Sequence, residues 1–295
     1  MKIPIIDSHH HVWEQKDLDW LQGKIQPRIF GDYTSIKKDY LIDDYIDDVV
    51  DFGVEKSVYI QCNWPVDKYL DEAKFIDDCF NSSGWPNAFI GYCNLLDKDA
   101  PEMINRLFDY PLTRGIRMQL HWHEKELYSF AHSPNIIDDP LFNKNFEYLS
   151  KHNSIFELQM FQGQKDQALR LLSRYPDVTF VLQHAGMPHD LSDDSMKIWF
   201  EFMTALSEFD NLIIKLSGLG TFMNKNDPIF IRDIVNQVLG IYSSDRCMFG
   251  SNFPIEKIWC EYKDIIDAYK QATNDLQQSA KKDIFYNTAS RIYRI

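Results

Sequence analysis

The chain has 295 residues, of which 44% are hydrophobic, and this is enough to form the core of one large α/β domain or of two small domains. Lys and Arg total 31 against 44 Asp and Glu, and the net charge of -13 argues against a nucleic-acid partner or an anionic membrane surface. The first residues lack the features of a signal peptide, and no apolar run approaches the ~18 residues of a membrane span, so we expect a soluble cytoplasmic protein.

The opening stretch is an apolar run that ends in an acid and three consecutive histidines. In an extended strand alternate side chains share a face, so Asp7, His9 and His11 are expected to point to one side. Histidine is the commonest metal ligand and titrates near neutral pH. The two imidazoles therefore indicate a metal site or a proton-transfer site, and the alternative is a strand that carries surface histidines.

Helical patterns alternate with short apolar strands along the rest of the chain. Residues 14–42 come first and form a long irregular connection, which in a compact domain is usually functional. Together with the opening strand, the predicted strands cover residues 56–61, 88–93, 115–120, 154–160, 178–183, 212–216 and 246–249. The predicted helices cover residues 43–52, 70–81, 101–110, 140–152, 165–175, 195–209, 228–242, 262–272 and 276–293.

This alternation favours a parallel sheet with right-handed crossovers. Eight strand-and-helix units in about 250 residues have the size of a (β/α)8 barrel, whose sites lie at the C-terminal ends of the strands. The alternative is a doubly wound open sheet, but no Gly-x-Gly-x-x-Gly or Gly-Lys-Ser/Thr loop follows any strand. We predict an α/β fold, a (β/α)8 TIM barrel, as one domain over residues 1–295 with a helical extension over about 275–295.

Polar residues are expected at the ends of the barrel strands, and nearly every predicted strand supplies them. In chain order they are His9, His11, Gln61, Arg117, Gln119, His121, Glu157, Gln159, Gln183, His184, Lys215, Ser217 and Asn252. His184 would be a third imidazole for His9 and His11, or a histidine that only caps its strand.

Two of these strand-end residues, Arg117 and Lys215, are cations within apolar strands. They either pair with carboxylates such as Asp7 or Glu157, or bind an anionic ligand, because an unpaired buried charge is costly.

A protein nucleophile finds no support in the sequence. No Gly-x-Ser-x-Gly elbow is present, and no cysteine has a distinctive setting. The five cysteines contain no Cys-x-x-Cys pair, so neither a disulfide framework nor a thiolate zinc site is indicated. What remains is activation of water by histidine, with or without a metal.

The chain resembles the amidohydrolase superfamily, and more narrowly its lactonase-type branch, amidohydrolase family 2. The matching stretches occur in the expected order and are Ile6-Asp-Ser-His-His-His-Val-Trp13, Gly115-Ile-Arg117, Phe156-Glu-Leu-Gln159, Leu182-Gln-His-Ala-Gly-Met-Pro188, Ile214-Lys-Leu-Ser-Gly218 and Arg246-Cys-Met-Phe-Gly-Ser-Asn-Phe-Pro254. The resemblance implies a (β/α)8 barrel that hydrolyses a small cyclic ester, with sugar-acid lactones and pyrone dicarboxylate lactones as the known substrate classes. It implies His9, His11 and His184 as metal ligands or as donors that polarise the lactone carbonyl, and Arg117 as a contact for substrate carboxylate or hydroxyl groups.

Two departures from the superfamily pattern affect the expected chemistry. The superfamily usually ends strand eight with a catalytic Asp, and the aligned residue here is Asn252, whose amide cannot serve as a base. Glu256 is the nearest replacement carboxylate, and His184 is another candidate base. A strand-four Lys and a strand-five His are also absent, so any metal would be single.

We therefore predict a lactonase that opens a sugar-acid lactone by His-assisted or metal-assisted attack of water, either with one Zn²⁺ or without a metal. The predicted catalytic residues are His9, His11, His184, Asn252 and Glu256, with His9, His11 and His184 as metal ligands. The predicted substrate-binding residues are Gln61, Trp64, Arg117, Gln159 and Lys215. The expected partner is an anionic or polyhydroxylated small molecule, and a homo-oligomer is compatible with the sequence.

Two other functions are compatible with the same motifs. One is decarboxylation of an aromatic or unsaturated acid by the same type of barrel. The other is a barrel that binds a sugar acid without turning it over, because Asn252 replaces the usual Asp.

Overall fold

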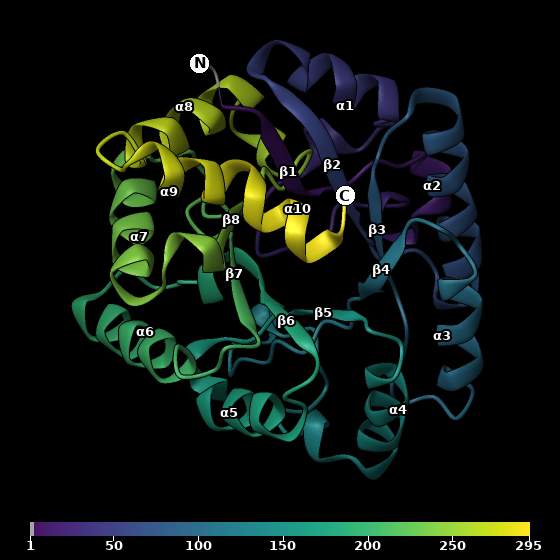
Figure 1. Ribbon diagram of the computed structural model, residues 1–295. Coiled ribbons are helices and arrows are strands. Elements are labelled where there is room, and N and C mark those ends of the chain that lie inside the picture. The colour runs from purple at the N-terminus through teal and green to yellow at the C-terminus, as the bar shows by residue number, and fades with distance from the viewer. Residues whose placement is uncertain (1–2) are drawn as a thin grey trace.

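The computed structural model describes residues 3–295, and its strands form a ring at the centre of the molecule (Figure 1). The strands are β1 (Ile5–His10), β2 (Val54–Ile60), β3 (Ala88–Gly91), β4 (Thr113–Ile116), β5 (Ile155–Leu158), β6 (Thr179–Leu182), β7 (Leu212–Leu216) and β8 (Cys247–Phe249). Each pairs in parallel with the next, so the order in the sheet is the order along the chain.

The ring closes between β1 and the loop that follows β8. His10 and Phe253 form a parallel bridge, and the Asn252 N–H donates to the His9 carbonyl oxygen over 2.7 Å. The Ser8 hydroxyl donates to the Phe249 carbonyl oxygen over 2.6 Å. The first and last strands of an open sheet would not meet, so the predicted (β/α)8 barrel is confirmed.

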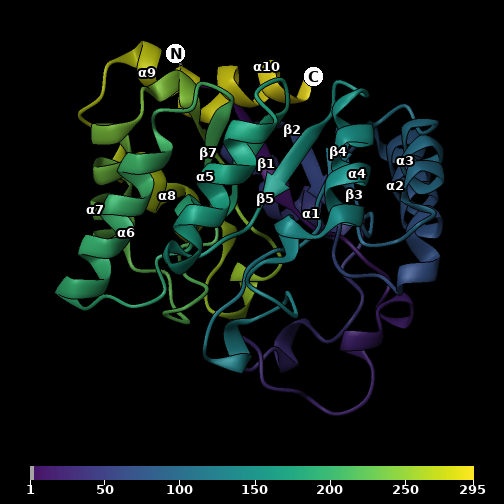
Figure 2. The same cartoon turned by 90° about the horizontal axis from the view of Figure 1, so that it is seen from below.

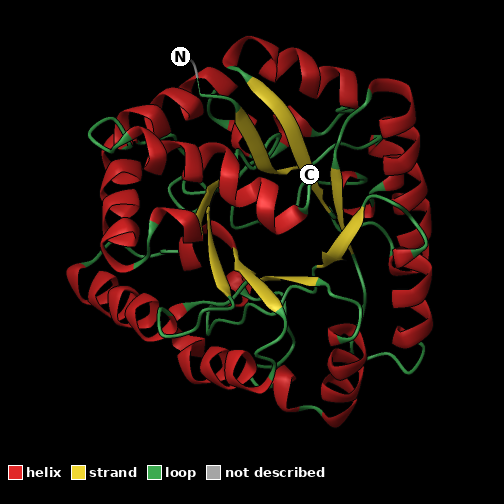
Figure 3. Cartoon of the chain, in the orientation of Figure 1, coloured by secondary structure: helices red, strands yellow, loops and turns green. Residues whose placement is uncertain are grey.

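Helices surround this ring of strands (Figure 3). They are α1 (Ile42–Val49), α2 (Tyr69–Ser83), α3 (Ala100–Phe108), α4 (Pro140–Ser150), α5 (Lys165–Arg174), α6 (Asp193–Leu206), α7 (Pro228–Ile241), α8 (Tyr262–Ala272), α9 (Gln278–Lys282) and α10 (Thr288–Tyr293). The single helix predicted over 276–293 is wrong in detail, because a π-helical turn at Asp283–Asn287 separates α9 from α10. Among residues 3–295, no helix combines the length and apolarity that crossing a bilayer requires.

Two of the outer helices show how local sequence sets their start. α4 and α7 each begin with a proline that directly follows an aspartate, Asp139 or Asp227. Each aspartate accepts hydrogen bonds from two first-turn N–H groups, and proline lacks the N–H that the first turn leaves unpaired. The Asp-Pro pair therefore fixes where the helix begins.

The strands bury two layers of apolar side chains. The outer layer packs against the helices, and the inner layer fills the barrel with residues such as Ile6, Val58 and Ile90. Ile292 and Tyr293 of α10 belong to this inner layer. α10 therefore closes one end of the barrel, and the irregular segment that follows β1 lies at the opposite end (Figure 2).

Several strands end earlier than predicted. β4 stops at Ile116, so Arg117, Gln119 and His121 follow the strand instead of alternating within it. One backbone hydrogen bond to β3 follows the end of β4: the Arg117 N–H donates to the Gly91 carbonyl oxygen over 2.8 Å. The short strand releases these residues into the loop region, where side chains need not alternate between two faces.

A buried ion pair crosses the barrel interior between β5 and β7. Lys215 Nζ lies 2.7 Å from Glu157 Oε1, and both side chains have no exposed surface. The Tyr293 hydroxyl donates to the same Glu157 oxygen, and the Lys215 ammonium lies 5.2 Å from the centre of the Tyr293 ring. The C-terminal helix is therefore attached to the barrel by a polar contact as well as by apolar packing.

We expect Tyr293→Phe to lower the free energy of unfolding by about 1 to 3 kcal/mol, since it deletes a hydrogen bond to a buried carboxylate. Urea unfolding followed by circular dichroism measures the change. Tyr286→Phe is the matched control, because in the described part of the chain the Tyr286 hydroxyl makes no hydrogen bond. Equal stability of the two variants would contradict the role assigned to the Tyr293 hydroxyl.

Candidate functional site

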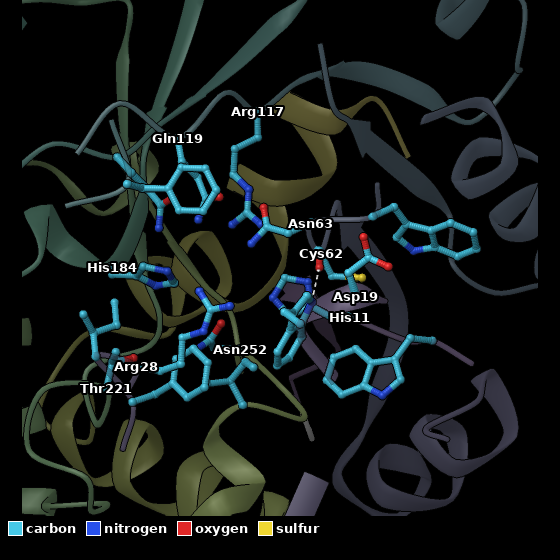
Figure 4. Close-up of a pocket in the computed structure, with 18 of the residues that line it drawn as sticks. His11, Asp19, Arg28, Cys62, Asn63, Arg117, Gln119, His184, Thr221 and Asn252 are labelled. Carbon is cyan, nitrogen blue, oxygen red and sulfur yellow. Dashed lines mark hydrogen bonds between the residues drawn. The ribbon is translucent and has the colours of Figure 1, made fainter. Parts of the chain in front are cut away.

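A cavity of about 560 Å³ opens where the C-terminal ends of the strands meet (Figure 4). Its strand-end lining residues are His11 after β1, Cys62 after β2, Arg117 after β4, Gln159 after β5, His184 after β6 and Asn252 after β8. Loops add aromatic walls from Trp13, Trp20, Phe30, Phe130 and Phe222. This is the end of the barrel at which active sites of this fold lie.

The structure brings three imidazoles together at the floor of this cavity. The ring centre of His9 lies 5.1 Å from that of His11 and 4.9 Å from that of His184. His9 is fully buried behind the other two, which line the cavity. The predicted meeting of imidazoles from the first and sixth strands is therefore observed.

An unusual backbone holds His184 in this position. Residues 184–187 all have positive φ values, with φ 55° at His184, 49° at Ala185 and 54° at Met187. Such a run costs free energy in non-glycine residues and persists only when its surroundings hold it. The Trp199 indole N–H donates to the Ala185 carbonyl oxygen over 2.8 Å and supplies part of that support.

His184 also depends on a glycine across the cavity floor. A Cβ atom at Gly218 would lie 2.4 Å from His184 Nδ1, so only glycine leaves room for the ring. The same Nδ1 lies 2.9 Å from the Ser217 hydroxyl. The other ring nitrogen of His184, Nε2, takes no part in this contact.

All three imidazoles are held in the neutral form. Burial, followed by repulsion from Arg117, lowers the pKa of both His11 and His184 to about 3, and burial lowers the pKa of His9 well below its usual value. His11 Nδ1 lies 2.7 Å from the Ile60 carbonyl oxygen, which only accepts, so Nδ1 carries the proton. His11 Nε2 therefore carries the lone pair, and the Asn252 side chain makes a hydrogen bond to this imidazole.

The two strand-end cations have different partners. Lys215 pairs with Glu157, so the carboxylate alternative holds for Lys215. Arg117 instead donates to the Gln183 side-chain oxygen over 3.2 Å and to the Gln61 carbonyl oxygen. No carboxylate within residues 3–295 lies within ion-pair distance of Arg117. Burial lowers the pKa of Arg117 to about 10, so it remains a cation at neutral pH.

Some predicted substrate-binding residues do not line the cavity. Trp64, Arg117 and Gln159 line it, whereas Gln61 and Lys215 are fully buried beneath it. Lys215 is occupied by Glu157, and the Gln61 side-chain oxygen accepts from the Asn63 N–H over 2.7 Å. Gln61 and Lys215 therefore do not line the cavity, although Gln61 Nε2 is buried without a hydrogen-bond partner in the described residues.

Asn252 and Glu256 are in contact, but only Asn252 reaches the cavity. Asn252 lines the cavity with φ 60°, while Glu256 is buried behind it and accepts from the Trp259 indole N–H over 3.1 Å. Burial raises the pKa of Glu256 to about 8, so at neutral pH this carboxyl is mostly protonated. Glu256 therefore does not reach the cavity directly, and its role as the replacement base stays a prediction.

The predicted metal ligands match zinc in chemistry but not in arrangement. They are neutral imidazoles, and both ring nitrogens of His9 are buried without a hydrogen-bond partner in the described part of the chain. Yet residues 3–295 contain no group of three His, Cys, Asp or Glu side chains placed so as to hold a metal ion.

Residues 14–42 were predicted to be functional, but no role was predicted for Arg28. Arg28 lines the cavity, its Nε is buried without a hydrogen-bond partner in the described residues, and its guanidinium carbon lies 6.0 Å from the centre of the Trp20 ring. Figure 4 shows it on the same side as His184 and Asn252. An irregular loop has no periodicity that could have singled it out.

Two further histidines, His121 and His123, lie outside the cavity lining. His121 packs against the rings of Phe130 and Phe161 and does not line the cavity. His123 Nε2 lies 3.1 Å from His189 Nε2, in a separate contact between two loops.

The pKa of Glu256 makes a prediction about stability and pH. A pKa raised from 4.5 to about 8 means that the folded protein binds this proton more tightly than the unfolded chain. Stability is therefore lost as the pH rises through this range, and Glu256→Gln, which cannot titrate, escapes the loss. Between pH 5 and 8 we expect the variant to gain about 3 kcal/mol relative to the wild type. Urea unfolding at both pH values measures this, and parallel pH dependences would contradict it.

Comparison with known proteins places this geometry in a family. The sequence model described as Amidohydrolase, family 2, matches residues 6–295. An uncharacterised protein of Sinorhizobium fredii is 29% identical over 99% of both chains, and an L-fucono-1,5-lactonase of Burkholderia multivorans is 23% identical over 98% of this chain and 96% of its own. A crystal structure of a Burkholderia multivorans amidohydrolase with bound zinc, 21% identical, superimposes with a TM-score of 0.82 over 99% of both chains. The protein therefore belongs to amidohydrolase family 2.

Proposed function

We propose that this protein is a hydrolase that opens a small lactone, with sugar-acid lactones as the substrate class, by attack of water on the ring carbonyl. The similarity to the L-fucono-1,5-lactonase along 98% of the chain supports this reaction class. The observation that carries the proposal is the cationic Arg117 beside the neutral imidazoles of His11 and His184. Lactone hydrolysis needs a positive group for the oxyanion and a lone pair for the proton of water.

The cavity lining suits a polyhydroxylated or anionic ring. The amides of Gln119 and Gln159 offer donors and acceptors for hydroxyl groups, and the Trp20 face offers an apolar surface. Arg28 and Arg117 offer cations to a carboxylate of the ligand, and the carboxylates of Asp19 and Asp67, which also line the cavity, offer acceptors for hydroxyl groups. These features support a small sugar acid or a related carboxylated lactone.

Water is a better candidate nucleophile than the one thiol in the cavity wall. Cys62 lines the cavity, but burial, followed by the nearby Glu72, raises the pKa of its thiol well above the usual value. The thiol is therefore protonated at neutral pH, whereas the thiolate is the reactive form.

The residues present suggest a sequence of steps. Arg117 donates to the carbonyl oxygen, and the lone pair of His11 Nε2 accepts a proton from the attacking water. The pKa of His11 is low partly because Arg117 repels the imidazolium, and negative charge developing on the carbonyl oxygen offsets that repulsion. Collapse of the tetrahedral intermediate breaks the ring ester bond, and the leaving alkoxide takes the proton to give a hydroxy acid.

We further propose that His9, His11 and His184 are the residues that would hold a single zinc ion. When bound, zinc would lower the pKa of a coordinated water to near neutrality. A related amidohydrolase of known structure carries bound zinc, which supports the choice of ion. With zinc bound, the lone pair of His11 Nε2 would be taken up by the ion, so the base role of His11 applies to the metal-free protein, whereas the role of Arg117 is the same in both cases.

A panel of neutral and carboxylated lactones tests the reaction. We expect substrate-dependent acid release by the wild type and a loss of about 100-fold or more in kcat/KM for Arg117→Met, the size found when one oxyanion donor is removed. Arg170→Met is the matched control, because Arg170 is exposed and pairs with Asp138 on the surface.

Three results would contradict the proposal. Release of carbon dioxide in place of acid from an unsaturated carboxylic acid would identify a decarboxylase. Thermal stabilisation by a sugar acid without turnover would identify a binding protein. Gain of turnover by Asn252→Asp would then show that the missing carboxylate is what prevents catalysis. Full activity of Arg117→Met would disprove the role of the guanidinium.

Zinc titration of chelator-treated protein tests the metal assignment. We expect one equivalent to bind, and His11→Gln to weaken binding by about tenfold or more, because a ligand nitrogen is lost. His152→Gln is the control, since His152 packs against Phe108 away from the cavity. Unchanged zinc affinity in His11→Gln would contradict this ligand set.

A further inference from the structure

A chain of buried hydrogen bonds connects Arg117 to the barrel interior. Arg117 Nη1 donates to the Gln183 side-chain oxygen over 3.2 Å, and Gln183 Nε2 donates to Glu157 Oε2 over 2.8 Å. Lys215 donates to the other oxygen of Glu157 over 2.7 Å. Gln183, Glu157 and Lys215 have no exposed surface, and Arg117 meets the cavity at the end of this chain.

The chemistry of the neighbours fixes the orientation of the Gln183 amide. A guanidinium only donates hydrogen bonds and a carboxylate only accepts them. Gln183 must therefore present its oxygen to Arg117 and its nitrogen to Glu157. A side chain with a different donor and acceptor pattern cannot bridge this pair.

The amide also keeps two opposite charges apart. Within residues 3–295, Glu157 is the one carboxylate at ion-pair distance from either Arg117 or Lys215, and it pairs with Lys215. The hydrogen-bonded group thus contains two cations and one acid, while Glu72 and Glu157 act on Arg117 only from beyond ion-pair distance. Arg117, at the cavity, is therefore the cation of this group that lacks a directly paired carboxylate. The adjacent imidazoles are neutral and do not balance it. A buried unpaired cation is costly and favours an anionic partner.

We propose that Gln183 is a positioning residue, which aims Arg117 at the cavity and prevents Glu157 from neutralising it, so that the guanidinium is free to bind an anionic oxygen of the ligand. This inference rests on the proposed function for the identity of that oxygen, the lactone carbonyl or the product carboxylate. The binding property itself does not require turnover.

The test compares Gln183→Glu and Gln183→Leu, each in the wild type and in the Arg117→Met background. Gln183→Glu places a carboxylate against Arg117, and Gln183→Leu removes the bridge without adding charge. The probe is gluconate, a sugar acid, whose affinity is measured by calorimetry beside kcat and KM for the lactone panel. Gln164→Leu is the matched control, because Gln164 is equally buried but donates to the Leu120 carbonyl oxygen outside this network. Thermal unfolding of each variant accompanies the binding data.

We expect Gln183→Glu to weaken gluconate binding by about tenfold or more, the range of a hydrogen bond to a charged group, and Gln183→Leu to weaken it less. In the Arg117→Met background neither change should have a further effect, whereas Gln164→Leu should act equally in both backgrounds. Among variants that remain folded, a loss that persists without Arg117 would show a merely structural role and overturn the proposal. Wild-type gluconate binding that does not depend on Arg117 would overturn it as well. Binding that follows the expected pattern without lactone opening would support Gln183 and count against the lactonase function alone.

Discussion

Glu157 is a fully buried carboxylate, and the interior of the barrel is arranged to satisfy it. Lys215 of β7, Gln183 at the end of β6 and Tyr293 of α10 all donate to its two oxygens. Removing one partner of such a group leaves a buried charge without compensation, at a cost of about 3 to 5 kcal/mol for an ion pair. The closure of the barrel by α10 and the direction of Arg117 therefore depend on the same acid.

The site differs from its superfamily pattern at the position where a carboxylate is usual. Asn252 lines the cavity, and the nearest acid, Glu256, is protonated at neutral pH behind the wall. In the proposed mechanism, the positive charge of Arg117 and the neutral lone pairs of the imidazoles act in place of a carboxylate at position 252. A chemistry that accumulates negative charge on the substrate suits such a site better than one that needs a strong base.

The order of strands and helices could be predicted from apolar periodicity, because each element buries one face against its neighbours. The meeting of His9 and His184 followed from barrel closure, since strand ends of a closed parallel sheet share one rim. Glu157 was one of the carboxylates predicted as a partner of Lys215. The choice between Glu157, Asp7 and an anionic ligand could not be predicted, because the pairing is made across the barrel between β5 and β7. Arg28 was missed because an irregular loop carries no pattern that links its side chains to a site.

The left-handed backbone at residues 184–187 affects the choice of an inactive variant that still binds the ligand. Alanine is the usual replacement for a catalytic histidine, but residue 184 sits at φ 55°, where asparagine is several-fold enriched among non-glycine residues. Asparagine would fit the turn and keep a polar atom for the Ser217 hydroxyl, while lacking the imidazole lone pair. A β-branched substitute would instead strain the turn, and any loss of function would then report on folding as much as on chemistry.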